Sequence, residues 1–186
     1  MRRALGIAVP LAFFAAVGGY VWSFDERAPS AADRQIVLAN VLRALPDDAR
    51  RIGARFGDAI ELAAADQEST QAMPGEETKV VLYWRSLAHA AGDPRVFAHL
   101  EGPGGSRTNF DHQPVYGLYP IASWKRGEIV RDEVWVTFPD RARVGEHVLW
   151  VGLYDESTGE RVSVDAAGDA IVDGEDRVRA AGWRLP

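Results

Sequence analysis

The feature that most constrains this fold is an alternation of side-chain faces that begins beyond Gly57. In residues 78–87, the apolar side chains Val80, Leu82 and Trp84 share one face of an extended chain. Successive side chains of a β-strand point to opposite faces, so a period of two predicts a strand with one face in the core. We therefore expect residues 78–87 to pair within a sheet.

Three further segments predict strands. Residues 96–101 and 128–138 alternate in the same way, and residues 147–154 are a nearly unbroken apolar run, which is typical of a central strand covered on both faces. The inward sets are Val96, Ala98 and Leu100, and then Val130, Val134, Val136 and Phe138; the outward sets are Phe97, His99 and Glu101, and then Arg131, Glu133 and Trp135. Glycine-containing turns follow at residues 103–105, 125–127, 143–145 and 155–159. This pattern predicts an all-β domain, an antiparallel immunoglobulin-like β-sandwich, over residues 53–186.

The N-terminus carries a different pattern. Residues 4–24 are uncharged and mostly apolar, and as a helix they would reach about 31 Å, which is enough to cross a bilayer. The run exceeds the ~7–15 apolar residues of a signal peptide, so it predicts a transmembrane helix in residues 1–24, with a cleaved signal as the alternative. Arg2 and Arg3 precede it, which places the following domain outside the bacterial inner membrane, in the periplasm.

Residues 25–52 are expected to form a linker and a helix. Apolar residues follow a helical spacing over residues 32–45, up to Pro46, which predicts a short amphipathic helix. Residues 47–56 are interpreted as a second helical turn before Gly57.

Composition excludes several functions. A net charge of -6 makes nucleic acid an improbable partner, and the absence of cysteine removes disulfides, thiolate metal ligands and thiol nucleophiles. The sequence contains neither a nucleophile-elbow context nor a phosphate-binding loop motif, and its acidic pairs are sequence neighbours. We expect a protein that is not an enzyme and carries no cofactor.

The richest polar segment is residues 111–120. Asp111, His112, Tyr116 and Tyr119 supply a carboxylate, an imidazole and two phenols, and Trp124 follows shortly after. Aromatic rings stack on sugar faces while polar groups give direction, so these five residues are the predicted ligand-binding set and a saccharide is the predicted ligand. The alternative is a structural loop, in which Asp111 caps a turn and Tyr119 fills the edge of the core. Trp124 is then a core plug, with Glu128 and Asp132 as charges at a strand edge.

A metal site is a further alternative. His99 together with Asp111 and His112 would supply two imidazoles and a carboxylate, if the fold brings them together. His89 and His147 add no recognised ligand spacing. The pattern alone assigns no metal ligand.

Several stretches resemble a known group of domains. They are residues 55–58 (RFGD), 82–85 (LYWR), 96–100 (VFAHL), 111–120 (DHQPVYGLYP), 124–132 (WKRGEIVRD), and 151–155 (VGLYD) with 158–161 (TGER). Together they resemble bacterial extracytoplasmic β-sandwich domains found C-terminal to multispanning membrane glycosyltransferases of the dolichyl-phosphate-mannose mannosyltransferase type. The resemblance implies the sandwich fold but carries no activity, and this chain departs from those enzymes by having a single expected span.

Three functions follow as expectations. The first is a non-catalytic, membrane-anchored extracytoplasmic module that contacts a glycan or protein partner in envelope biogenesis, held in the inner membrane by residues 4–24. The second is a structural accessory domain that docks on an integral membrane enzyme such as a glycosyltransferase. The third is a periplasmic metal-binding protein.

Overall fold

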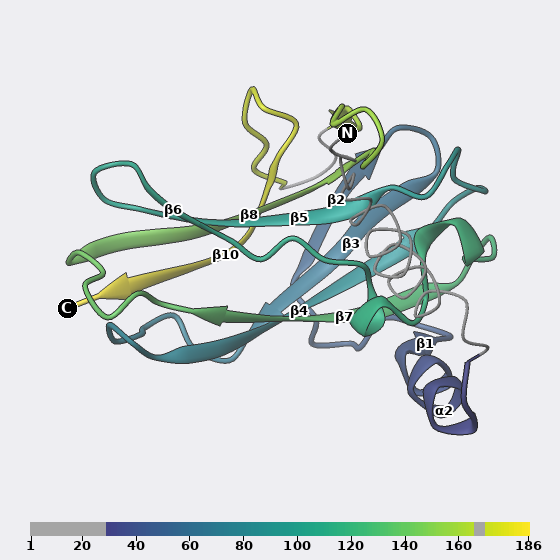
Figure 1. Ribbon diagram of the computed structural model, residues 1–186, viewed down its shortest axis with the longest axis horizontal. Coiled ribbons are helices and arrows are strands. Elements are labelled where there is room, and N and C mark those ends of the chain that lie inside the picture. The colour runs from purple at the N-terminus through teal and green to yellow at the C-terminus, as the bar shows by residue number, and fades with distance from the viewer. Residues whose placement is uncertain (1–28, 166–169) are drawn as a thin grey trace, which may run out of the picture. The chain divides into compact units, whose positions relative to one another are not determined.

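Two antiparallel sheets face each other in the computed structural model, which describes residues 29–165 and 170–186 (Figure 1). The larger sheet, in spatial order, contains β1 (Val41–Leu42), β7 (Ile129–Thr137), β4 (Glu77–Ser86), β3 (Ile60–Gln67), β2 (Arg51–Phe56) and β9 (Val164–Asp165). The smaller sheet contains β10 (Val178–Leu185), β8 (Gly145–Tyr154), β5 (Arg95–Gly102) and β6 (Ser106–Asn109). Two short 3-10 helices, η1 (Val115–Gly117) and η2 (Ile121–Ser123), precede β7. The predicted β-sandwich is confirmed at this level.

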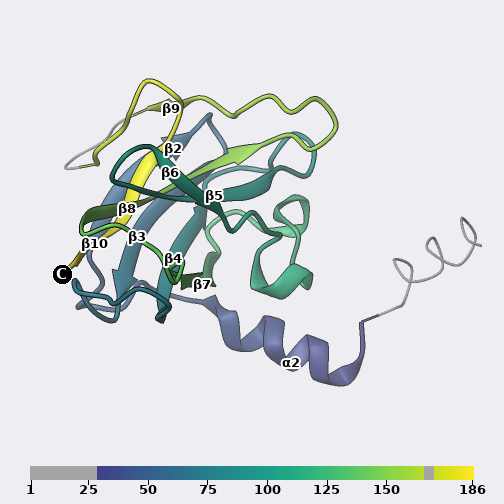
Figure 2. The same ribbon diagram turned by 60° about the vertical axis from the view of Figure 1, so that its left-hand side comes forward.

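The core lies between the sheets, where the alternation placed it. Figure 2 shows the strands of both sheets from a second direction. Leu82 and Trp84 on β4 are fully buried against residues of the smaller sheet's inner face, which include Leu149 and Val151. Phe138, just after β7, meets Trp183 of β10 edge-on, with 5.4 Å between the ring centroids. Such edge-to-face contacts add to the burial of apolar area that holds the two layers together.

The outer face of the larger sheet is partly covered as well. Val81, Tyr83 and Ile129 are buried there in a second apolar cluster with Ala49, and Leu45 packs against them. The connection between β1 and β2 therefore shields one end of this face. The opposite end carries half-buried and exposed side chains of β7.

The predicted central strand is β8, which lies between β10 and β5. Leu149, Val151 and Leu153 are buried in the core. The other face is only half-buried at Trp150, over which the Arg177 guanidinium lies at 5.2 Å from the ring. The prediction that this strand is covered on both faces is therefore wrong for its outward face.

The segment before Gly57 differs from the prediction. Residues 51–56 form β2, and they pair with β3, a strand that the alanine-rich residues 60–67 did not reveal. Gly57, at a φ of 52°, turns the chain so that Phe56 lies opposite Ile60. The predicted boundary at residue 53 thus falls inside β2, because strand pairing overrides the weak local preference.

The helix α2 (Ala31–Asn40) is shorter than the predicted 32–45. It begins with a capping pair, in which Ser30 Oγ accepts from the Asp33 amide at 3.1 Å and Asp33 accepts from the Ser30 amide at 2.7 Å. It ends where Val41 and Leu42 pair with β7 as β1. None of its residues is buried, so it adds no apolar contact to the core.

The predicted membrane anchor, residues 4–24, lies outside the described residues. Within residues 29–165 and 170–186, no helix combines the length and hydropathy needed to cross a bilayer.

Two matched leucine substitutions test this division between core and surface. Leu82→Ala should lower the free energy of unfolding by about 2–5 kcal/mol, because it empties a fully buried site. Leu38→Ala should change it by less than about 0.5 kcal/mol, because Leu38 is 66% exposed on α2. Urea unfolding of both variants measures the difference, and equal losses would show that α2 contributes to the core.

Candidate functional site

A buried carboxylate organises the loop that the sequence singled out. Asp132 lies in the middle of β7, between Val130 and Val134 on the inward face, and it is 1% exposed. Its Oδ2 lies 2.8 Å from His112 Nε2, and its Oδ1 accepts a hydrogen bond from the Val115 amide at 2.9 Å. Both oxygens therefore hold one loop. The expectation that Asp132 is an edge charge is wrong, because its parity on the strand points it inward.

We term the contacts of Asp132 with His112 and Val115 the clamp. Within it, His112 uses both of its ring nitrogens. Nδ1 donates to the Phe110 carbonyl at 2.8 Å, and Nε2 faces the Asp132 carboxylate. Since both partners are acceptors, the doubly protonated imidazolium fits this setting best. Burial is the largest single influence and lowers the pKa of His112, but the hydrogen bond and charge of Asp132, with the Phe110 carbonyl, together raise it above the ordinary 6.5.

The clamp precedes a left-handed turn. Val115, Tyr116 and Gly117 have φ values of 54°, 59° and 78°, a conformation that glycine adopts readily and a β-branched residue does not. Strain of this kind costs about 1–3 kcal/mol per residue and persists where surrounding contacts enforce it. Here the burial of the Val115 side chain and the hydrogen bond from its backbone amide to Asp132 enforce the left-handed conformation. The result is that Tyr116 stands outward, 60% exposed.

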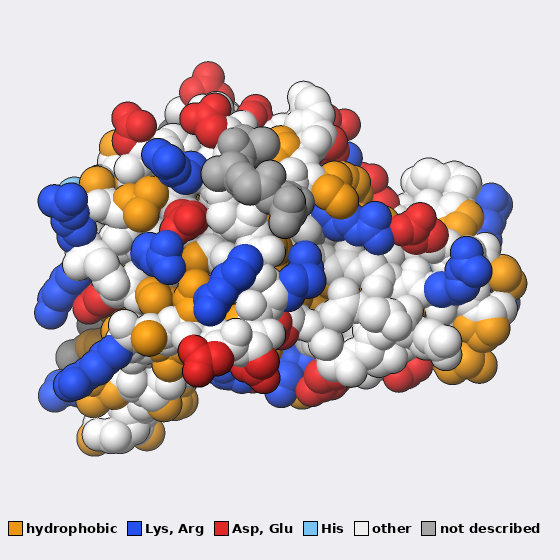
Figure 3. All heavy atoms as spheres, turned by 180° about the vertical axis from the view of Figure 1, so that it is seen from behind, with side chains coloured by type: hydrophobic (Ala, Val, Ile, Leu, Met, Phe, Trp, Pro, Cys, Tyr) orange, Lys and Arg blue, Asp and Glu red, His pale blue; other side chains and the backbone are white. Residues whose placement is uncertain are grey.

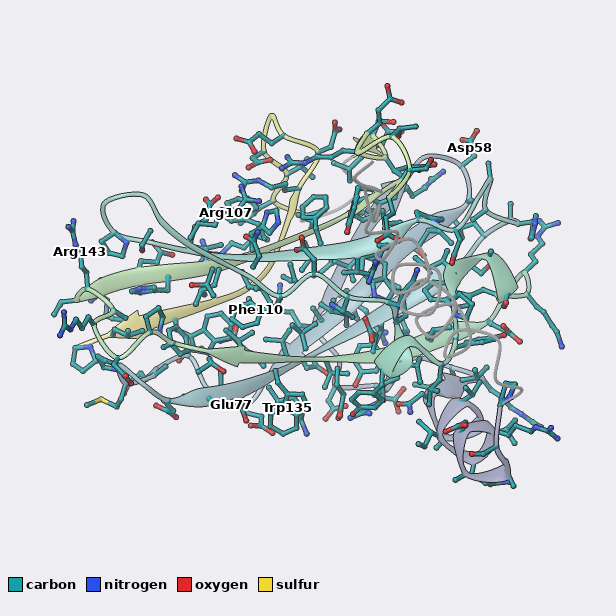
Figure 4. The ribbon with its side chains drawn as sticks, in the orientation of Figure 1. Asp58, Glu77, Arg107, Phe110, Trp135 and Arg143 are labelled. Carbon is teal, nitrogen blue, oxygen red and sulfur yellow. The ribbon has the colours of Figure 1, made fainter. Side chains whose placement is uncertain are left out.

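Tyr116 joins a group on the outer face of the larger sheet, which we term the aromatic patch: Tyr116, Glu133, Trp135, Arg131 and Lys79. Its hydroxyl donates to Glu133, which also accepts from Arg131 at 2.6 Å. Lys79 lies 3.5 Å from Glu133 and 5.4 Å from the ring of Trp135. Trp135 is 46% exposed, and Figure 4 shows it on the outward side of the sheet, beside Glu77.

The charges within the patch stabilise one another. Burial would raise the pKa of Glu133, but hydrogen bonds from Tyr116 and Arg131, and the charges of Arg131 and Lys79, hold it below its usual range. Glu133 is thus an anion with filled acceptor sites, not a proton donor. Two exposed rings beside fixed charges and donors suit the binding of a polar ligand with flat apolar faces.

Tyr119 and Trp124 belong to the framework of the loop. The Trp124 side chain is buried, and its Nε1 donates to the Tyr119 carbonyl at 3.1 Å. The Tyr119 hydroxyl donates to Glu128 at 2.7 Å, and burial followed by this bond raises the pKa of the phenol. Glu128 also accepts a hydrogen bond from the Lys125 amide at 2.8 Å, which closes the turn at residues 125–128. These contacts follow the structural alternative, in which Trp124 plugs the core.

Asp111 lies apart from His112. Adjacent residues of an extended segment point to opposite sides, and Asp111 faces the outer side of the smaller sheet, where its Oδ1 accepts from the Ala98 amide at 3.1 Å. The same oxygen is 3.2 Å from Nε2 of His99. His99 Nε2 also lies 2.7 Å from an Arg107 nitrogen, and because a guanidinium only donates, Nε2 accepts.

His99 is accordingly neutral. Burial lowers its pKa to about 4, and the nearby Arg107 acts in the same direction. The two histidines thus have different partners: Nε2 of His99 is bonded to Arg107, and Nε2 of His112 is bonded to Asp132. Among the described residues, no three His, Asp or Glu side chains form a group suited to a metal ion.

The five predicted residues do not converge on one site. Tyr116 reaches the outer face of the larger sheet, Asp111 that of the smaller sheet, and His112, Tyr119 and Trp124 support the loop. Sequence reasoning did not assign Glu133 and Trp135 to a site, although it placed both on the outward face. It also missed Asp132, whose position among inward valines was the available signal.

No protein-family model matches the chain, and no curated protein matches its sequence. The chemistry of the site therefore rests on its own geometry.

Replacing the central carboxylate tests the clamp. Asp132→Ala should lower the free energy of unfolding by about 3 kcal/mol or more, because it leaves the His112 imidazolium and the Val115 amide without their acceptor. Asp111→Ala is the matched control. It should lower the free energy of unfolding by about 1 kcal/mol or less, since Asp111 is partly exposed and accepts a hydrogen bond from one backbone amide. Chemical denaturation of both variants decides, and similar losses would contradict the central role of Asp132.

The clamp also predicts a pH dependence. Because the folded state raises the pKa of His112, its contribution to stability is fully present below pH 6.5 and is lost as the pH rises through the folded value. The difference in unfolding free energy between the wild type and His112→Gln should therefore shrink as the pH is raised above 6.5. Denaturation at a series of pH values measures it, and a constant difference would contradict a pKa of His112 that is raised by folding.

Proposed function

We propose that this protein is a non-catalytic binding module of the bacterial envelope, which contacts a glycan through the aromatic patch. In this proposal residues 4–24 hold it in the inner membrane, and an immunoglobulin-like sandwich presents the patch in the periplasm. The observation that carries the glycan contact is that two exposed rings, Tyr116 and Trp135, lie beside the same charged groups, Glu133 and Lys79.

The physical reasons favour a saccharide over a purely apolar ligand. Sugar rings offer C–H faces that stack on aromatic rings and hydroxyls that exchange hydrogen bonds with charged groups. Arg131 and Lys79 are donors beside the rings, and Glu133 orders them. The left-handed turn fixes Tyr116 before a ligand arrives, which reduces the entropy lost on binding.

The same geometry supports a role without catalysis. The acid–imidazole pair of Asp132 and His112 is the group most similar to a catalytic dyad, but the carboxylate is buried, and the ring nitrogens of His112 are both engaged, one by the Phe110 carbonyl and one by Asp132 itself. The pair shapes the loop and offers no free base to a substrate.

Titration of the full chain with a panel of bacterial surface oligosaccharides tests the proposal. Tyr116→Ala and Trp135→Ala should each weaken binding at least about fivefold, because each removes a ring from the contact. Tyr116→Phe keeps the ring and should retain most of the affinity. Isothermal titration calorimetry measures the affinities.

The control is Met73→Ala, which removes a side chain of similar exposure outside the patch and should leave binding unchanged. If no oligosaccharide binds the wild type, or if the two alanine variants bind as well as it does, the glycan contact at this patch is rejected.

A second candidate has one observation in its favour. The helix α2 exposes Ile36 and Leu38 and buries none of its residues, which suits a segment that docks on another protein. This observation favours an accessory domain that attaches to an integral membrane enzyme such as a glycosyltransferase. Ile36→Ser with Leu38→Ser should then abolish co-purification with such an enzyme and leave oligosaccharide binding intact.

A further inference from the structure

A hollow of about 800 Å³ opens on the outer face of the larger sheet, at the end opposite to Trp135 along β7. It is lined by Arg51, Gly53 and Arg55 of β2, by Glu61 and Ala63 of β3, and by Arg85 of β4, with residues 43–45 and the start of β7 completing the wall. It shares no residue with the aromatic patch. Its volume is within the range of small-molecule sites in proteins.

Two β-bulges create this hollow. The β2–β3 register shifts between Arg51 and Ala54, and the β3–β4 register shifts between Leu62 and Ala64. Three residues lie within these shifts and line the hollow, and two of them, Gly53 at a φ of 73° and Ala63, are small and fill little of it; the third is Ile52, whose side chain is buried in the core. Bulges bend a strand locally and are common beside binding sites, so the concavity is part of the fold and not a gap between loops.

The charge of the hollow opposes that of the chain. Four arginines and one glutamate line it, whereas the whole protein carries a net charge of -6. Glu61 is paired with Arg85 at 2.7 Å, and Arg51 donates to the Pro46 carbonyl at 3.2 Å. The side chains of Arg43 and Arg55 form no hydrogen bond or ion pair with any residue that the structure describes. In the space-filling view, Lys and Arg side chains gather with hydrophobic side chains between them on the left of Figure 3.

We propose that this hollow binds a phosphate ester whose phosphate is held by Arg43, Arg51 and Arg55. A guanidinium presents paired donors that match phosphate oxygens, and a phosphate monoester carries close to two negative charges, which suits two arginines without partners. Leu45, Ala63 and Ile129 provide an apolar floor for the organic part of the ester. The hollow is larger than an inorganic phosphate needs, which favours an ester over the free ion.

Such a phosphate comes from one of two sources, a soluble sugar phosphate or the headgroup of an anionic lipid. Both are tested with the full chain. Glucose 1-phosphate is titrated against glucose by calorimetry, and vesicles of phosphatidylcholine with phosphatidylglycerol are compared with vesicles of phosphatidylcholine alone in a sedimentation assay. The comparison with neutral vesicles removes any binding through the N-terminal apolar segment.

The test variant is Arg43→Gln with Arg55→Gln. It removes two charges without breaking a contact among the described residues, so it should fold as the wild type does. The control, Arg141→Gln with Arg143→Gln, removes the same charge elsewhere; Figure 4 shows Arg143 at the end of the molecule far from Asp58, which lies in the turn between β2 and β3.

The expected result is that at least one phosphate probe binds more strongly than its neutral counterpart. The test variant should weaken that preference at least about tenfold, and the control should retain it. Preference for the sugar phosphate alone, or for the anionic vesicles alone, identifies the source. If neither probe is preferred by the wild type, or if both double variants lose the preference equally, the hollow is not a phosphate site. Oligosaccharide binding at the aromatic patch should be unchanged in the test variant, so the two sites are judged separately.

Discussion

The carboxylate of Asp132 is the contact on which the candidate site depends. A buried charge is costly unless it is paired and hydrogen-bonded, and this one is compensated by the His112 imidazolium and the Val115 amide. Both partners belong to the segment that follows the edge of the smaller sheet, whereas Asp132 is fixed in β7 of the larger sheet by its pairing with β4. The carboxylate therefore joins the loop that follows the smaller sheet to the larger sheet. It also stabilises the left-handed turn that directs Tyr116 outward.

The two proposed sites arise on the outer face of the larger sheet by different physical routes. The aromatic patch combines side chains of β4 and β7 with a ring delivered by the clamped loop, and its Glu133 is bonded to both Tyr116 and Arg131. The hollow comes from two bulges that bend adjacent strands and place Gly53 and Ala63 where larger side chains would fill the space. In both cases the backbone that carries the side chains is held by strand pairing or by a buried hydrogen bond. Such sites are preorganised, which lowers the entropic cost of binding.

The loop also shows why a cluster of polar residues in sequence need not form one site. Asp111 and His112 are adjacent, yet an extended backbone sends them to opposite sides, toward His99 and Asp132 respectively. The two histidines consequently have opposite electrostatic settings. Burial, and after it the charge of Arg107, lowers the pKa of His99 to about 4, while Asp132 raises the pKa of His112. A shared metal site would require both rings to present free lone pairs to one point, and their bonding partners prevent this.

The sequence by itself determined the strands at residues 78–87, 96–101, 128–138 and 147–154 and the turns between them, because side-chain alternation and turn residues are local properties of the chain. For the three alternating strands it also determined which face enters the core, but for residues 147–154, an unbroken apolar run, it did not. It also placed Glu133 and Trp135 outward and offered the interpretation of Trp124 as a core plug. Only the tertiary structure decided that residues 51–56 and 60–67 are strands, since their pairing outweighs a weak local preference. It alone paired Asp132 with His112, 20 residues away, and set the register shifts that open the hollow. Contacts between distant segments depend on how two sheets pack, and the spacing of residues along one chain does not encode that arrangement in readable form.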